Sequence, residues 1–87
     1  MIIARHQDFL KHYKKRVSQN PKLIKKFEER LNLFLVDPNH PLLQNHKLIS
    51  QKSIFRSFSI TGDIRVVYKI EGDATRLYDI GTHNQVY

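Results

Sequence analysis

The chain has 87 residues and a net charge of +7; 40% of its residues are hydrophobic, and none is cysteine. A chain this short buries only about 60% of the surface that its unfolded form exposes, which excludes a large multi-step enzyme and predicts a single domain over residues 1–87. The absence of cysteine excludes disulfides, thiolate nucleophiles, cysteine-ligated zinc and iron–sulfur clusters.

The N-terminal residues read as a short strand that leads into a helix. Residues 1–4 are mainly apolar but are followed at once by polar residues, so this run is too short for a signal peptide or a membrane span. We therefore expect a cytoplasmic protein. Beyond His6, apolar residues recur at every fourth position, at Phe9, Tyr13 and Val17, and this spacing predicts a first helix.

A second helix is predicted to begin at Asn20 and Pro21. Asparagine caps free helical amides, and proline tolerates the first helical position because its missing N–H is not needed there. An apolar stripe then continues for about four turns and ends before Asp37 and Pro38, and Pro41 predicts that the linker is not helical. The stripe consists of Leu23, Phe27, Leu31, Phe34 and Leu35.

The net charge lies on these two helical segments. Residues 5–26 contain eight basic residues and one acid, whereas the other seven bases and seven acids cancel. Charge runs on helices are usually solvated faces, but this excess is more than solubility requires, and attraction to phosphates is its natural use. On charge alone, an acidic protein would be an equally good partner. The bases that we assign to RNA or ribosome binding are Lys11, Lys14, Lys15, Arg16, Lys22, Lys25 and Lys26.

In the second half of the chain the hydrophobic period changes to two. Alternation over residues 54–60 and 64–70, with Thr-Gly-Asp at 61–63 between them, predicts a hairpin. A second turn at 71–73 leads to a last strand at 75–80. The element order β-α-α-β-β-β predicts an α+β fold whose two helices pack on one face of a mainly antiparallel sheet. Alternation places Ser57, Ser59, Arg65 and Lys69 on the opposite face, which we expect to be polar and uncovered.

Two histidines are the first candidates for chemistry. His46 and His83 are predicted to lie in loops, where a histidine can act as acid, base or ligand near neutral pH, although a single one is more often only solvated. No histidine pair has a zinc-site spacing and the glycines are scattered, so we predict no metal and no nucleotide cofactor. The remaining histidines read as helix-surface or turn residues: His6, His12 and His40.

Two arginines of the predicted hairpin differ in their expected roles. Arg65 falls on the polar face of a central strand, where a long cation is costly unless it faces water, a carboxylate or a phosphate, so we favour a functional role. Arg56 falls on the same face as Phe58, and for it we predict a structural ion pair at the margin of the sheet.

Three segments of the second half together resemble the RelE/ParE toxin superfamily of bacterial toxin–antitoxin modules, nearest to its YafQ-like branch. They are PLLQNHKL at 41–48, IFRSFSITGDIRVVYKI at 54–70 and LYDIGTH at 77–83, followed by a terminal aromatic residue. The resemblance implies a RelE-like fold. It also implies a toxin that acts as a ribosome-dependent mRNA endoribonuclease and cuts codons in the ribosomal A site by attack of the 2′-hydroxyl on the adjacent phosphate.

The same resemblance assigns roles to individual residues. His46 and His83 match the catalytic histidines of the family. Asp63 matches a catalytic-site aspartate, and Arg65 matches the arginine that stabilises the phosphate. Tyr87 matches the aromatic residue at the C-terminal edge of the site. The residues that complete the predicted RNA-binding set are Lys47, Ser57 and Ser59.

One departure from the family leaves alternatives open. YafQ-like members carry an acid and a histidine where this chain has Ser57 and Ser59, and serine is a poor proton carrier near neutral pH. Either the two histidines suffice, or activity is reduced or lost. A ParE-like inhibitor of gyrase, which shares the fold without cutting RNA, and a non-catalytic binding module remain the alternatives.

The resemblance also implies partners. In such modules an antitoxin encoded nearby neutralises the toxin, and the complex of the two proteins contacts operator DNA through the antitoxin. The ribosome and mRNA would be the other partners, and no membrane is implied. Because the basic segments are predicted to lie away from the polar sheet face, we expect them to dock the toxin on the ribosome while the sheet face cuts.

Overall fold

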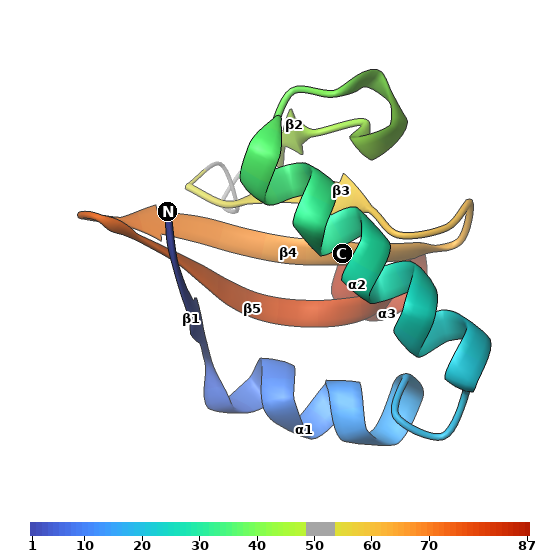
Figure 1. The fold of residues 1–87 in the computed structure, drawn as a ribbon. Helices are drawn as coiled ribbons and strands as arrows, with labels where there is room; N and C mark the ends of the chain where they lie inside the picture. The colour runs from blue at the N-terminus through green and yellow to red at the C-terminus, as the bar shows by residue number, and fades with distance from the viewer. Residues whose placement is uncertain (49–53) are drawn as a thin grey trace.

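The computed structural model of the chain describes residues 1–48 and 54–87. Its helices and strands are β1 (Ile2–Arg5), α1 (Gln7–Arg16), α2 (Pro21–Val36), β2 (His46–Lys47), β3 (Arg56–Ser59), β4 (Ile64–Glu71), β5 (Ala74–Thr82) and α3 (His83–Val86), with a 3₁₀ turn at Pro41–Leu43. Within the described residues, five strands form one sheet in the order β1-β5-β4-β3-β2. β1 runs parallel to β5, and the other neighbouring strands are antiparallel. The predicted α+β fold with a mainly antiparallel sheet is confirmed (Figure 1).

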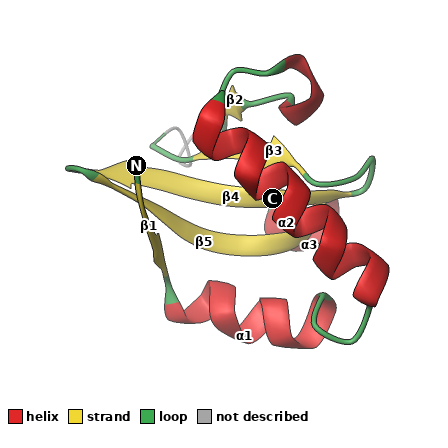
Figure 2. Cartoon of the chain, in the orientation of Figure 1, coloured by secondary structure: helices red, strands yellow, loops and turns green. Residues whose placement is uncertain are grey.

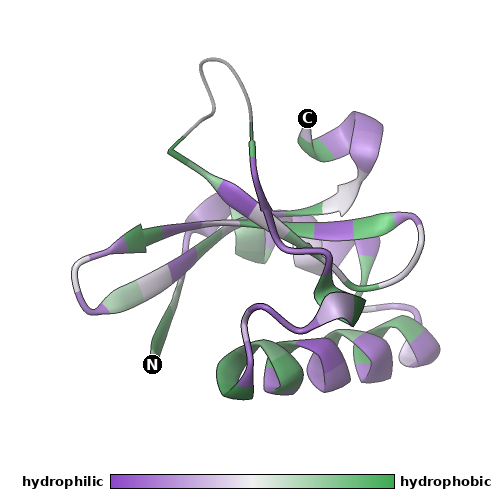
Figure 3. Cartoon of the chain, turned by 90° about the horizontal axis from the view of Figure 1, so that it is seen from above, coloured by the Kyte–Doolittle hydropathy of each residue, from purple (hydrophilic) through white to green (hydrophobic). Residues whose placement is uncertain are grey.

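The two N-terminal helices cover one face of the sheet. In Figures 1 and 2, α2 crosses in front of the central strands and α1 lies along β5 at the other edge. Figure 3, seen from above, shows α3 on the opposite side of the sheet from α2. No helix in the described part of the chain is long and apolar enough to cross a membrane. The core between the helices and the sheet consists of Phe9, Val17, Phe27, Phe34, Leu43, Phe58, Ile60, Val66, Tyr68, Leu77 and Ile80.

Side-chain caps explain where the helices begin. The Oδ1 of Asn20 accepts a hydrogen bond of 3.2 Å from the N–H of Leu23, and Pro21 is the first residue of α2, as predicted. The Nδ1 of His6 accepts from the N–H of Asp8 at 3.0 Å, so His6 is a helix cap rather than the helix-surface residue that we expected. The predicted apolar stripe is buried at its centre, but Leu35 near its end is 38% exposed.

The linker after α2 is more regular than predicted. Pro41 begins a 3₁₀ turn instead of preventing helical structure, because its fixed φ suits the first position of a helical turn and His40 Nδ1 accepts from the N–H of Leu42 at 3.1 Å. His46, predicted to lie in a loop, belongs to the two-residue strand β2, which pairs with β3. A pairing this short leaves no periodic signal in the sequence.

The C-terminal end also differs from the prediction. The last strand runs to Thr82, two residues beyond the predicted end, and His83 begins the four-residue helix α3 instead of lying in a loop.

The first strand of the hairpin is shorter than the alternation over residues 54–60 predicted. Ile54 is 61% exposed and precedes β3, so it does not share the buried face of Phe58.

The second face of the sheet is covered, contrary to the prediction. Ser57 is fully buried and Ser59 is 6% exposed, because α3 packs over this face. A small second cluster joins Leu48, Val67 and Val86, and the partly buried rings of Phe55 and Tyr87 pack against it. The cluster seats α3 on the sheet.

Further along this face, Glu71 is the centre of an ionic network. The contacts of its carboxylate predict that the stability of the fold depends on pH. The Oη of Tyr78 donates to its carboxylate at 2.7 Å, and Arg76 and Lys69 lie 3.0 and 3.7 Å away. The hydrogen bond from Tyr78 is the main cause that lowers the pKa of Glu71 below its ordinary value of 4.5, and the two cations act in the same direction.

Because the folded state lowers this pKa, the stabilisation is complete above the ordinary value and is lost as the pH falls through the lowered one. We expect Glu71→Gln to lower the melting temperature at neutral pH and to differ little from the parent chain in acid. Melting curves of both proteins over a series of pH values test this, with Asp73→Asn as a control carboxylate in the adjacent turn. A melting-temperature difference that stays constant in acid would contradict it.

Candidate active site

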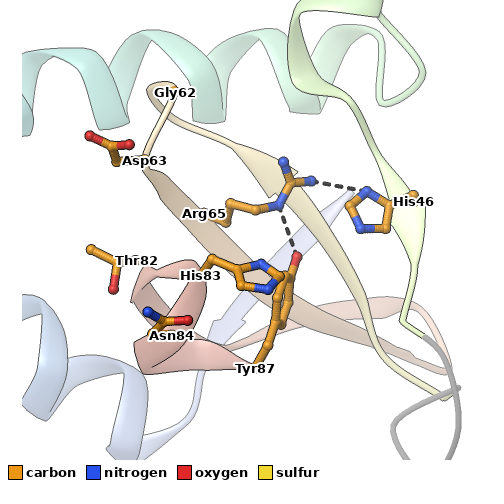
Figure 4. Close-up of a pocket in the computed structure, with 8 residues that line it drawn as sticks. All are labelled: His46, Gly62, Asp63, Arg65, Thr82, His83, Asn84 and Tyr87. Carbon is orange, nitrogen blue, oxygen red and sulfur yellow. Dashed lines mark hydrogen bonds between the residues drawn. The ribbon is translucent and has the colours of Figure 1, made fainter.

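One open pocket of about 520 Å³ lies where β4 begins and β5 ends. In Figure 4, Arg65 extends from β4 between His46 and Tyr87. All five residues that the sequence nominated as catalytic line this pocket, although they come from segments far apart in the chain. The lining residues are His46, Gly62, Asp63, Arg65, Thr82, His83, Asn84 and Tyr87.

Arg65 is the most constrained side chain of the pocket. Its Nε donates to Ser57 Oγ at 3.0 Å and to Tyr87 Oη at 2.9 Å. Its Nη2 donates to the main-chain carbonyls of Gln44 and Ser57 at 2.8 and 3.2 Å. Among the described residues no hydrogen bond uses Nη1, so this nitrogen is available to a ligand. The guanidinium is therefore oriented before any ligand binds.

The carbonyl of Gln44 links Arg65 to His46. Gln44 has a left-handed backbone with φ of 46°, which is uncommon for a residue other than glycine and is often found at functional sites. The carbonyl lies 3.0 Å from His46 Nδ1, and this nitrogen lies 3.2 Å from Arg65 Nη2. Because a carbonyl only accepts and a guanidinium only donates, the ring of His46 has a partner at Nδ1 in either tautomer.

α3 brings His83 and Tyr87 to the pocket. The side-chain oxygen of Gln85 accepts from the N–H of Thr82 at 2.8 Å, as in a capping box, and so caps the start of the helix. The rings of His83 and Tyr87 are 4.5 Å apart and nearly perpendicular. Tyr87 Oη also shares a short hydrogen bond with Ser57 Oγ. The helix is short, but His83 at its start and Tyr87 directly after it both have defined neighbours.

Asp63 lies across the pocket from His46 (Figure 4). It belongs to the turn between β3 and β4, where Thr61 Oγ1 accepts from the N–H groups of Asp63 and Ile64 at 3.2 and 3.0 Å. Asp63 is exposed, and no hydrogen bond in the described part of the chain involves its carboxylate. The carboxylate is therefore accessible to a ligand.

The two serines support other groups. Ser57 is fully buried and its Oγ is shared by Arg65 and Tyr87, while Ser59 Oγ donates to the carbonyl of Thr61 at 2.6 Å. These side chains hold the arginine and the turn in place. Direct contact with RNA, which the sequence had suggested, would require them to give up these partners.

The basic residues divide into exposed ones and one that is turned inward. Lys22 and Lys26 line a cleft of about 320 Å³ with Thr61, the residue that precedes the pocket residues Gly62 and Asp63. The start of α2 therefore borders the candidate site, and the predicted separation of basic segments from that face is incomplete. Among the lysines of residues 1–48 and 54–87, the exposed ones are Lys11, Lys14, Lys15, Lys22, Lys25 and Lys47. By contrast, the guanidinium of Arg16 lies against β5: it donates to the carbonyl of Ile80 at 2.9 Å.

Sequence reasoning missed the residue that ties the linker to the sheet. Asn45 Nδ2 donates to the carbonyl of Pro38 at 2.9 Å, and its Oδ1 accepts from Arg56 Nε at 3.1 Å and from Tyr68 Oη at 3.0 Å. The predicted structural role of Arg56 is thus correct, but its partner is an amide and not a carboxylate. The role of the Gln44 carbonyl was also missed, because a backbone group has no signal in the side-chain pattern.

The described residues contain no group of three or more histidine, aspartate or glutamate side chains arranged to hold a metal ion. Histidines outside the pocket have local partners. His12 Nδ1 lies 2.6 Å from the Asp79 carboxylate, and the ring of His6 stacks on Tyr78 at 4.7 Å. His12 is therefore paired with the sheet and is not the free helix-surface residue that we expected.

The order and pairing of the strands and helices are those of the RelE-like α+β fold. Over residues 1–87 the chain matches the family described as the bacterial toxin of type II toxin–antitoxin systems, YafQ. The chain therefore belongs to the YafQ toxin family. No curated protein matches it.

Solved structures share the fold at low sequence identity. A copper-bound mutant toxin from Helicobacter pylori is 24% identical with a TM-score of 0.79, covering 100% of this chain and 99% of that one. YafQ from E. coli strain BL21(DE3) is 20% identical with a TM-score of 0.77 (98% and 96% covered), and YafQ in the E. coli DinJ–YafQ complex is 22% identical with a TM-score of 0.75 (98% and 96%). A YoeB/ParE toxin from Agrobacterium tumefaciens is 16% identical with a TM-score of 0.80 (95% and 99%).

Proposed function

We propose that this toxin is an endoribonuclease that cuts mRNA in the A site of the ribosome and so inhibits translation in the cytoplasm. The observation that carries the proposal is the convergence of His46, Arg65 and His83 on one open pocket with a pre-oriented guanidinium. RNA cleavage by its own 2′-hydroxyl needs a base, a cation beside the phosphate and an acid. These three side chains supply such groups without a metal or a cofactor.

His46 is the general base of the proposed reaction. With its proton on Nδ1, the ring donates to the Gln44 carbonyl at 3.0 Å, and the unprotonated Nε2 is left to accept the proton of the 2′-hydroxyl. Loss of that proton lets the 2′-oxygen form a bond to the adjacent phosphorus. The shared carbonyl keeps the base and Arg65 in register, because both bind the same oxygen.

Arg65 stabilises the charge that develops on the phosphate. Its Nε and Nη2 are occupied by protein partners, and Nη1 faces no such partner among the described residues. A donor that is fixed in advance stabilises a transition state without reorganisation at the moment of reaction. We assign Nη1 to a non-bridging phosphate oxygen.

His83 is the general acid. It gives a proton to the leaving 5′-oxygen as the bond from phosphorus to that oxygen breaks, and the products are a 2′,3′-cyclic phosphate and a 5′-hydroxyl. Tyr87 orients this side of the pocket through its ring contact with His83 and its bond to Arg65. Asp63, on the opposite rim, is accessible for a hydrogen bond to the ribose or base of the bound nucleotide. Because two histidines and an arginine complete the set, Ser57 and Ser59 need not carry protons.

We assign ribosome docking to the exposed lysines of α1 and α2 and to the partly exposed Lys26, because cations on helix surfaces attract the phosphates of RNA. Replacing Lys14, Lys15, Lys25 and Lys26 by Glu should weaken ribosome binding by at least about tenfold at low salt, and each lost phosphate contact should reduce the salt slope by about 0.7 to 0.9. Sedimentation with ribosomes at several salt concentrations measures both. A variant that binds like the parent chain would show that these lysines serve another partner.

We further propose that an antitoxin protein neutralises the chain. The support is membership of a toxin–antitoxin family, the complex of the E. coli relative with DinJ, and the net charge of +7, which suits an acidic partner. Contact with operator DNA would then occur through the antitoxin complex.

Mapping of mRNA 5′ ends after induced expression tests the proposed function. We expect new ends within codons of translated messages, and fewer of them when translation initiation is blocked. Growth arrest with intact mRNA and inhibited supercoiling would instead favour a ParE-like action on gyrase. Growth arrest with neither effect would indicate a non-catalytic binding module.

A further inference from the structure

Arg16 differs from the other cations of the basic segments in what it touches. Its side chain is 21% exposed, and its Nη1 donates to the carbonyl of Ile80 at 2.9 Å and lies 3.4 Å from the carboxylate of Asp79. The same carboxylate accepts from the N–H of Ile80 at 2.8 Å and lies 2.6 Å from His12 Nδ1. Arg16 is therefore committed to the end of β5, immediately before the helix that carries His83.

The next residue of β5, Gly81, leaves the space that this arrangement needs. Gly81 is buried and is the cross-strand neighbour of Arg65. A Cβ at this position would lie 2.7 Å from Arg16 Nη1 and 2.6 Å from Gln85 Oε1, both far inside van der Waals contact. The Gln85 oxygen is the atom that caps α3 by accepting from the N–H of Thr82. Gly81 thus gives room to the α1 guanidinium on one side and to the α3 cap on the other.

We propose that Arg16 is a positioning residue of the candidate active site, acting through Gly81 and Gln85 on α3, rather than a ligand of ribosomal RNA. The guanidinium pins the Ile80–Gly81 peptide against α1, and the absent side chain of Gly81 lets Gln85 close the first turn of α3. The placement of His83 and Tyr87 then depends on Arg16, a residue of α1. The catalytic consequence rests on the proposed function, whereas the effect on α3 does not.

The physical basis is the shortness of α3. A helix of four residues has little intrinsic stability, and its position depends on its cap and on Val86 in the small cluster. Loss of the Arg16 contact frees the end of β5, and a methyl group at Gly81 displaces the capping oxygen. Either change should move His83 relative to Arg65, and a misplacement of about 1 Å can cost about 100-fold in rate.

The test compares Arg16→Ala and Gly81→Ala with two matched controls. NMR of the isolated full chain reports on α3, and separate assays with ribosomes report on binding and cleavage. Gly62→Ala is the control for an added methyl group in the NMR measurements alone, because a Cβ at Gly62 would meet no described atom within 4 Å but Gly62 itself lines the pocket. Lys15→Ala is the control for the lost charge, since Lys15 is the exposed neighbour of Arg16 on α1. The readouts are the amide shifts and hydrogen exchange of α3, the His83 ring signals, ribosome affinity and the kcat of mRNA cleavage.

We expect Arg16→Ala and Gly81→Ala to shift the α3 and His83 signals, to speed α3 amide exchange about tenfold, and to lower kcat about 10- to 100-fold with ribosome affinity within about twofold of the parent chain. Both controls should leave the α3 signals in place. The double variant should lose little more than Gly81→Ala alone, because both changes act on the placement of α3 through the same end of β5. Unchanged α3 signals in Arg16→Ala, or a loss of ribosome affinity like that of Lys15→Ala, would overturn the proposal. If the parent chain itself cuts no mRNA but the two variants still displace the α3 signals, the positioning role is upheld and only the proposed function is contradicted.

Discussion

Arg65→Ala should lower mRNA cleavage by about 1,000-fold while the chain stays folded. The expected size follows from the loss of a fixed cation beside a phosphate in the transition state, which commonly costs about 10² to 10⁵ in rate. The fold should persist, because Ser57 Oγ and Tyr87 Oη still bind each other when the guanidinium is gone. The rate at which the variant cuts a defined message on programmed ribosomes measures the loss of activity. The melting temperature shows whether the variant stays folded.

Arg65→Lys is the matched variant for this prediction. Lysine keeps the charge but cannot bind Ser57, Tyr87 and the Gln44 carbonyl through a planar fork, so we expect it to recover only a small part of the activity. Full activity in Arg65→Lys would show that charge alone suffices. Activity in Arg65→Ala within about tenfold of the parent chain would remove Arg65 from the proposed chemistry.

Phe58→Ala should lower the free energy of unfolding by about 3 to 5 kcal/mol, the range found when a buried Phe is truncated to Ala. Phe58 is fully buried, its ring stacks on Phe34 with centroids 4.5 Å apart, and it lies 5.8 Å from Tyr68. The total free energy of unfolding of a native domain is only about 5 to 15 kcal/mol. Much of the native state would therefore be lost at growth temperature. The midpoint and slope of the urea unfolding curve give the change in the free energy of unfolding.

Phe58→Leu keeps most of the buried volume and should lose much less stability, which keeps the comparison measurable if the alanine variant does not fold. A loss below about 1 kcal/mol in Phe58→Ala, the size of an ordinary substitution, would contradict the central position that we assign to this ring.

The fold could be predicted from the sequence because its main elements have strong local signals. Asn20 and Pro21 mark the start of α2, and alternation together with the turn around Gly62 defines the β3–β4 hairpin. β2 and α3 were missed because two paired residues or one helical turn are too short to show a period. For the same reason the covered second face was not foreseen, because α3 contributes to that cover.

The candidate site was predictable in its residues but not in how they are held. Side-chain type and motif position nominated His46, Arg65 and His83, and the structure brings them together in one pocket. The Gln44 carbonyl and the inward turn of Arg16 depend on backbone conformation and on packing between distant segments. Neither feature affects hydrophobic periodicity or charge counts. The charge count grouped Arg16 with the lysines of the two helices, whereas the structure shows its guanidinium in contact with β5.

The central claim is that this pocket cuts RNA by means of the substrate's own 2′-hydroxyl. The most direct measurement programs ribosomes with a message whose A-site codon carries a single 2′-deoxy nucleotide at the cut position, and compares it with the all-ribose message. We predict that only the ribose message is cut, that it ends in a 2′,3′-cyclic or 3′-phosphate, and that the other product begins with a 5′-hydroxyl. Cutting of the 2′-deoxy message, or a product with a 5′-phosphate, would contradict it.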